Sequence, residues 1–175
     1  MSMGGTQGMG LLVAALGATL AASIEHSMLT QLLIGGVKPD LVMALAVGMA
    51  MLLGFEHGMV WAVVGGMMLD FLIPERVLGS TMLALLVVVG LALLIRRLSE
   101  EPSLPIIGLS VFILTFVYQA LLMFLIAVTT GNAIQSVAVQ SYAFIALMNA
   151  GIAVVAVWAC RGLLERFGRL ERVAW

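Results

Sequence analysis

The chain has 175 residues, of which 63% are hydrophobic and 10% are charged, and its mean hydropathy is +1.19. Soluble domains carry about 25% charged residues, so this composition excludes a water-soluble globule and predicts a protein embedded in a bilayer. The formal net charge of -1 provides no overall basic field, and we therefore expect no nucleic-acid partner.

Six apolar runs follow one another between charged residues and turn residues. They lie at 9–24, 41–55, 58–73, 78–95, 104–128 and 140–160. A bilayer core about 30 Å thick takes roughly 20 helical residues, so the second and third runs are short. Either they span with their terminal charges in the headgroup region, or they form a helical hairpin that is buried among neighbouring helices.

The first run is predicted to be an uncleaved helix, because no Lys or Arg precedes it as in a signal peptide. Ala14, Ala18 and Ala22 fall in one row, since residues four apart share a helix face. Small residues let another backbone approach closely. The row therefore predicts either tight packing within the bundle or docking of another membrane protein. Residues 23–38 are expected to form a partly exposed, interfacial segment.

The third run repeats this spacing. Gly58, Ala62 and Gly66 form its row of small residues, and Asp70 occupies the next position in that row. As in the first run, the alternatives are an ordinary contact within the protein and a surface that faces a partner.

Asp70 lies close to the C-terminal end of its run, where the helix dipole disfavours an anion by up to roughly 1 kcal/mol. A carboxylate in this place needs compensation. We expect it either to accept hydrogen bonds from the backbone of the turn at 74–80 or to pair with Arg76 or Lys38. Direct contact with a partner and proton transfer are the remaining alternatives.

Positive charge is distributed unevenly between alternate loops. With six spans, one face of the membrane receives only Lys38 and Arg76. The other face receives Arg96, Arg97, Arg161, Arg166, Arg169 and Arg172. The positive-inside tendency then predicts that both termini lie in the cytoplasm.

The fifth and sixth runs each contain an amide. Gln119 and Asn149 lie about nine residues from the outer ends of their runs, which corresponds to a depth of roughly 14 Å. Antiparallel neighbours at matched depth predict a shared hydrogen bond worth about 0.6 to 2 kcal/mol. Thr115 and Tyr118 would extend this buried polar pair if their faces agree.

The C-terminal residues, 161–175, place apolar side chains on one stripe and arginines elsewhere. This pattern predicts an amphipathic cytoplasmic helix that follows a membrane domain at 1–160. Such a helix binds either membrane lipids or a cytosolic partner.

We expect neither enzymatic activity nor a cofactor. The chain contains no phosphate-binding glycine loop, acyl-transfer nucleophile motif or zinc-protease helix. Glu25-His26 and Glu56-His57 are of metal-ligand type, but six spans send them to opposite faces, so no metal site is expected. The one cysteine, Cys160, excludes an intrachain disulfide.

Residues 34–90 carry an ordered set of signals. GGVKPDL begins the second run, glycines stand at 58, 65 and 66, and Leu69-Asp70 and Leu78-Gly79 follow. In this order the chain resembles MreD, the small integral membrane protein of the bacterial rod-shape system. The positions that match the family's pattern are Pro39, Asp40, Gly58, Gly66, Asp70 and Gly79. The acidic Glu56 departs from it, since family members often carry a basic residue there.

The resemblance implies an all-α polytopic membrane protein. Its fold would be a bundle of six transmembrane helices, similar to the substrate-binding (S) subunits of energy-coupling-factor transporters. The implied function is a non-enzymatic scaffold of the elongasome in the bacterial cytoplasmic membrane. This scaffold would bind the single-pass protein MreC and help to couple MreB filaments to a RodA-type glycosyltransferase and its transpeptidase.

Two other functions stay open. The shared fold permits a vitamin-binding S subunit, which would need several polar groups that converge in a pocket. A small-solute permease is the other alternative, and it is disfavoured because the two halves lack paired interrupted helices.

Overall fold

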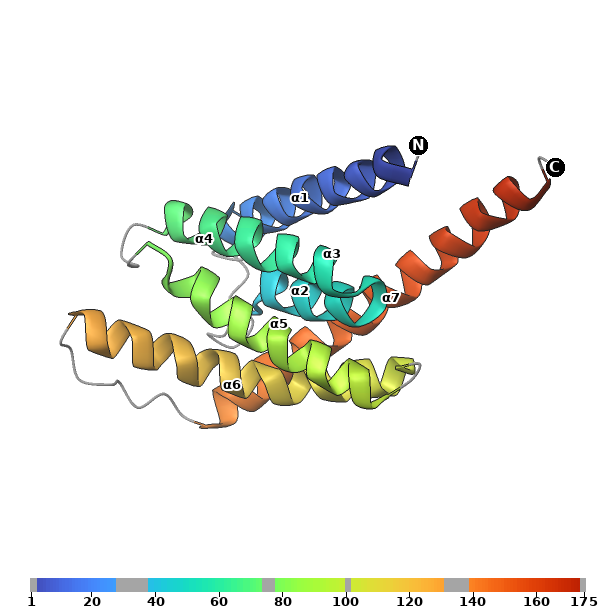
Figure 1. Ribbon diagram of the computed structural model, residues 1–175. Helices are drawn as coiled ribbons and strands as arrows, with labels where there is room; N and C mark the ends of the chain where they lie inside the picture. The colour runs from blue at the N-terminus through green and yellow to red at the C-terminus, as the bar shows by residue number, and fades with distance from the viewer. Residues whose placement is uncertain (1–2, 28–37, 74–77, 100–101, 131–138, 174–175) are drawn as a thin grey trace.

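The computed structural model describes residues 3–27, 38–73, 78–99, 102–130 and 139–173, and these ranges are helical apart from short turns (Figure 1). Five helices are continuous: α1 (Met3–Ser27), α2 (Leu41–Leu53), α5 (Ser80–Leu98), α6 (Leu104–Thr130) and α7 (Val139–Val173). Between α2 and α5, three segments follow one another without a gap: α3 (Phe55–Val60), the π-helical turn η1 (Trp61–Gly65) and α4 (Gly66–Leu72). The described chain thus forms six helical rods.

Four of the described helices are long and apolar enough to cross a membrane, namely α1, α5, α6 and α7. This result confirms the helical, transmembrane character that the composition predicts. α2 has 13 residues, which gives it a length of about 20 Å, and the rod α3–η1–α4 is interrupted by its π turn. The number of six crossings therefore stays a prediction.

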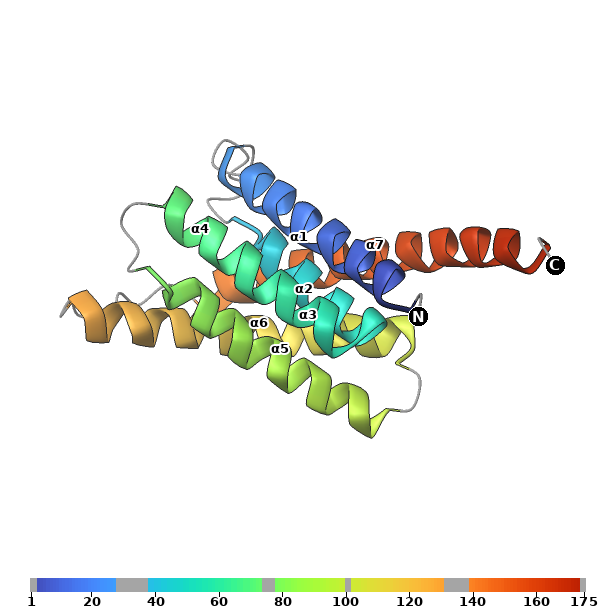
Figure 2. The same ribbon diagram turned by 45° about the horizontal axis from the view of Figure 1, so that its top comes forward.

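The bundle has two chemically different ends. The end that carries Arg96, Arg97, Arg161 and Arg166 is called the basic end here, and it is also the end where both chain termini lie (Figure 1). The opposite end carries Glu25, Asp40 and Asp70 and is called the acidic end. Figure 2 shows that α7 continues past the other rods at the basic end.

The two predicted rows of small residues both lie inside the bundle. Ala18, Ala22 and Ala62 have no exposed surface, and Ala14 is also buried. A Cβ atom on Gly58 would lie 2.5 Å from the Cβ of Ala50, so α2 and α3 are in close backbone contact. Of the two alternatives, the structure has packing within the protein, and neither row is free for a partner.

The first part of the predicted segment at residues 23–38 belongs to α1, which continues through Ser27, and Ser23, Ile24 and Ser27 are exposed there as predicted. The hydroxyls of Ser23 and Ser27 donate to the carbonyl oxygens of Thr19 and Ser23, respectively. Glu25 differs from the expected exposure, because its side chain is only 3% exposed. Residues 28–37 of that segment lie outside the described residues.

The predicted tail is not a separate helix. α7 runs without a break from the last apolar run to Val173. Gly162, which lowers helix propensity, does not end it. The division between a membrane domain at 1–160 and a tail at 161–175 therefore falls within one helix, and residues 174–175 lie outside the described part.

Candidate functional site

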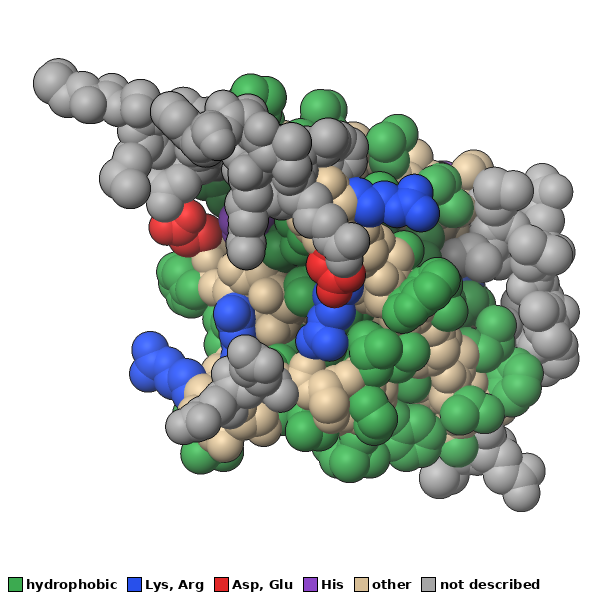
Figure 3. All heavy atoms as spheres, turned by 90° about the vertical axis from the view of Figure 1, so that its right-hand side faces the viewer, with side chains coloured by type: hydrophobic (Ala, Val, Ile, Leu, Met, Phe, Trp, Pro, Cys, Tyr) green, Lys and Arg blue, Asp and Glu red, His purple; other side chains and the backbone are tan. Residues whose placement is uncertain are grey.

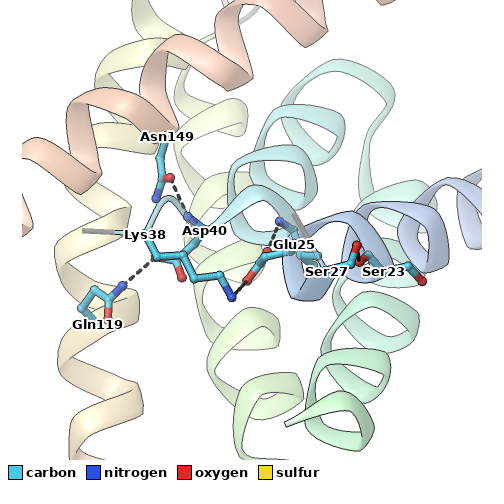
Figure 4. A network of polar contacts seen from close by, with 8 residues as sticks. Ser23, Glu25, Ser27, Lys38, Asp40, Gln119 and Asn149 are labelled. Atoms are coloured by element: carbon cyan, nitrogen blue, oxygen red, sulfur yellow. Dashed lines mark hydrogen bonds and ion pairs between the residues drawn. The ribbon is translucent and has the colours of Figure 1, made fainter. Parts of the chain in front are cut away.

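Polar side chains from three other helices hold the start of α2 (Figure 4). The Val42 backbone N–H donates to Oε2 of Glu25 from α1, at 2.8 Å. The Asp40 backbone N–H donates to Oδ1 of Asn149 from α7, at 2.9 Å. Nε2 of Gln119 from α6 donates to Oδ2 of Asp40, at 2.6 Å. Glu25 and Asn149 thus supply acceptors for N–H groups at the helix start that have no partner within the helix, whereas Gln119 donates to the Asp40 carboxylate.

The need for this network follows from the shortness of α2. Val42 in its first turn has no exposed surface, and an unsatisfied backbone N–H there would cost several kcal/mol. Asp40 precedes α2, but its side chain makes no capping hydrogen bond, so Glu25 supplies the acceptor. Nζ of Lys38 lies 3.8 Å from Oε1 of Glu25, and the N-terminal end of the α2 dipole adds further compensation for the carboxylate.

The predicted amide pair is brought together, but through a third residue. Gln119 and Asn149 both contact Asp40 rather than pairing directly. Asn149 is fully buried, and its Nδ2 donates to Oγ1 of Thr115 at 3.3 Å. Tyr118 lies in the hydrophobic core. The sequence signal for this hub was the acidic residue directly before an apolar run, which is a helix-start pattern.

The two amides should differ in their effect on stability. Gln119→Leu removes one hydrogen bond at a half-buried site, and we expect it to lower the unfolding free energy by less than roughly 2 kcal/mol. Asn149→Leu should cost more, because it removes two contacts at a fully buried site. Unfolding of both variants in detergent measures the difference. An equal or larger loss for Gln119→Leu would contradict this assignment.

Asp70 ties α4 to the start of α5. Its carboxylate accepts hydrogen bonds from the backbone N–H groups of Gly79 at 2.9 Å, Thr81 at 3.1 Å and Met82 at 3.4 Å. The side chain is 3% exposed. The dipole of its own helix disfavours the anion, but the N-terminal end of α5 faces it and offsets that effect.

This geometry is the first of the predicted alternatives, in which Asp70 binds the backbone of the turn. Lys38, one of the two predicted ion-pair partners, lies by Glu25 instead. Arg76, the other, lies outside the described residues. Gly79 has a φ of 92°, a left-handed conformation that favours glycine. The N–H of this glycine is one of the three that donate to Asp70.

Arginines close helix ends at the basic end. Nη1 of Arg96 donates to the carbonyl oxygen of Ala50, at 3.1 Å, in the last turn of α2. Nη2 of Arg161 donates to the carbonyl oxygen of Pro102, at 2.7 Å, just before α6. These side chains thus satisfy carbonyl groups at helix boundaries, in addition to any effect on orientation in the membrane.

Within the described ranges, no group of three or more His, Cys, Asp or Glu side chains is placed to hold a metal ion. The two Glu-His pairs lie far apart. A Cβ atom on Gly10 would lie 3.2 Å from Nε2 of His57. Glu25 follows Gly10 by fifteen residues on the same helix, a distance of about 22 Å.

An apolar groove of about 530 Å³ lies near the basic end. α1 and α7 form its walls, and α2 and the rod α3–η1–α4 form its floor. Residues from all four contribute, among them Met9, Val13, Met49, Leu53, Trp61 and Cys160. No local pattern in the sequence predicts this groove, because its lining residues come from three separate stretches, 9–17, 49–61 and 160–164. Such an apolar lining is suited to an apolar group.

Comparisons with known protein families, with curated proteins and with solved structures give no match.

Proposed function

We propose that the chain is a MreD-type scaffold of bacterial cell-wall elongation. It has no catalytic role, binds an MreC-like single-pass protein, and through it connects MreB-like filaments to the RodA-type glycosyltransferase and transpeptidase that build lateral peptidoglycan. The proposal includes residence in the bacterial cytoplasmic membrane, six crossings, and both termini in the cytoplasm.

One observation carries the proposal: the residues of the family pattern hold helix ends together. Asp40 joins α2 to α6 and α7, and Asp70 joins α4 to α5 with Gly79 in the turn. Gly58 and Gly66 permit close helix contacts. This use of the pattern favours a rigid binding platform, since its polar groups are engaged within the protein.

A vitamin-binding S subunit is the second candidate. The observation in its favour is that Asp40, Gln119 and Asn149 converge from three elements. A solute at that point would have to replace hydrogen bonds that the side chains already make with one another. Binding would therefore incur the cost of leaving buried polar groups partly unpaired, which makes this candidate the weaker one.

Co-purification tests the proposal. The tagged chain is co-expressed with the MreC-like protein of the same bacterium and extracted in mild detergent, with an unrelated single-pass protein as the control. We expect the MreC-like protein to be retained and the control protein to be lost. We also expect rod-shaped cells depleted of the chain to become round. Failure to retain that protein, together with a stoichiometric vitamin detected by native mass spectrometry, would favour the S subunit instead.

A further inference from the structure

The groove between α1 and α7 opens away from the bundle core. The last fully buried residue of α7 described at this end is Val157, and Leu163 and Leu164 beyond it are more than half exposed. On the opposite wall, Met9 and Val13 are about two-thirds exposed. The groove therefore remains accessible from the bilayer while its floor, which includes Trp61, is buried.

We propose that this groove seats the transmembrane helix of the single-pass partner. The inference rests on the proposed function, and it names the surface that performs it. The two predicted rows of small residues, on α1 and on the rod α3–η1–α4, are buried by packing within the protein. The groove offers an alternative with suitable chemistry, because methionines such as Met9 and Met49 adapt to the shape of an inserted side chain.

Charge at the mouth of the groove favours a helix over a phospholipid. Glu56 is exposed and directly precedes the groove residue His57. Figure 3 shows an acidic side chain beside the histidine at this end. Among the described residues, no ion pair involves Glu56. If this end is cytoplasmic, as proposed, the basic residues that flank a single-pass helix on that side would meet Glu56, whereas a lipid phosphate would be repelled.

The guanidinium groups of Arg96 and Arg161 are engaged with carbonyl oxygens of this chain. Arg96 donates to Ala50 and Arg161 to Pro102. Arg166 lines a different hollow, together with Trp158 and Gly162. None of these three arginines lines the groove itself.

Cys160 makes the proposal directly testable. It is the one cysteine of the chain and it lines the groove. Single cysteines are placed along the partner's transmembrane helix, and disulfides are formed in membranes with copper phenanthroline as the oxidant. We expect cross-links to Cys160 at partner positions three or four residues apart, since these share a helix face and a disulfide needs Cα atoms within about 7 Å.

The controls separate this inference from the function beneath it. Cross-links should vanish in Cys160→Ser and should not return when Leu94→Cys, an exposed site at the same end of the bundle, is added to that variant. Co-purification without any Cys160 cross-link, or equal cross-linking at Leu94→Cys, would overturn the groove assignment only. Loss of co-purification in the unmodified chain would overturn the proposed function itself.

A steric variant tests the same groove without cross-linking. Val13→Trp fills the groove mouth, whereas Val155→Trp makes the same change on α7 outside the groove, and both valines are 64% exposed. We expect Val13→Trp to weaken partner binding roughly tenfold through overpacking, with Val155→Trp close to unmodified. Unchanged partner binding by Val13→Trp, accompanied by loss of a co-purifying phospholipid, would identify lipid as the occupant and overturn the proposal.

Two matched substitutions test the contribution of charge to partner binding. Glu56→Gln should reduce partner binding and its dependence on salt, because it removes the carboxylate at the groove mouth. Glu165→Gln removes an exposed carboxylate at the same end that does not line the groove, and it should have little effect. Equal effects of the two substitutions would contradict the proposed contact.

Discussion

Replacing Gly66 by leucine is expected to destabilise the protein by about 3 kcal/mol or more, or to prevent its folding. A Cβ atom at this position would lie 2.6 Å from the Cα and 2.9 Å from the backbone nitrogen of Met82. Because both atoms belong to the backbone of α5, no rotamer change can relieve the contact, and α4 and α5 would have to separate. Gly66→Ala should already show a large part of the loss.

Gly90 provides the matched control for this prediction. It lies within α5, and a Cβ atom there would meet nothing within 4 Å. Gly90→Ala and Gly90→Leu should therefore leave the thermal midpoint in detergent unchanged or raise it slightly, since glycine is a poor helix former. If Gly66→Leu and Gly90→Leu had equal midpoints, the close α4–α5 contact would be refuted. Reduced partner binding by a stable Gly66→Leu would instead place that face at the partner.

Asp70→Ala is expected to be the second large loss, again about 3 kcal/mol or more. The substitution leaves the N–H groups of Gly79 and Thr81 without their acceptor at a buried helix start, and each unsatisfied group costs about 1–3 kcal/mol. Asp70→Asn keeps one acceptor oxygen but loses the charge that faces the α5 dipole. It should therefore fall between Asp70→Ala and the unmodified protein when unfolding is measured in detergent.

Glu165 serves as the control for Asp70, because it is an exposed carboxylate on α7. Glu165→Ala should change the unfolding free energy by no more than about 0.5 kcal/mol. Asp70→Ala and Gly66→Leu act on the same contact between α4 and α5, so their effects should not add. A loss for Asp70→Ala as small as that of Glu165→Ala would show that the three backbone contacts contribute little.

The helices themselves could be predicted because the length of an apolar run is a local property. The runs at 41–55 and 104–128 correspond to α2 at Leu41–Leu53 and α6 at Leu104–Thr130. Asp70 could be predicted in the same way, since its partners lie only nine to twelve residues away. Because the chain reverses after α4, a carboxylate at the end of that helix lies beside the start of the next one.

The network around α2 could not be predicted to the same degree. Gln119 meets Asp40 across 79 positions of sequence and Asn149 across 109. Their positions along the helices predicted that the two amides lie at the same depth. That Asp40 lies between them depends on the tertiary fold. Glu25 was the clearest failure, because a charged residue near the end of an apolar run is typical of an interface. The short α2 nevertheless draws Glu25 into the interior as the acceptor for Val42.

The groove and the π turn had no local signal at all. η1 buries Trp61 and Gly65 in a turn that contains no proline and has no polar residue of its own. Trp61 then packs against α1, where a Cβ atom on Gly17 would lie 3.1 Å from its ring. Gly17 therefore accommodates an aromatic side chain.

The proposed platform depends on a bundle whose basic end lies inside the cell. Thiol labelling of intact cells measures this directly, with single cysteines placed in a Cys160→Ser background. Leu78→Cys marks the acidic end, where residue 78 is exposed, and Ser99→Cys marks the turn after α5 at the basic end. A membrane-impermeant maleimide is expected to label Leu78→Cys in intact cells and Ser99→Cys only after lysis. Labelling of Ser99→Cys in intact cells, with Leu78→Cys protected, would reverse the bundle and remove the basis for the proposed partner site.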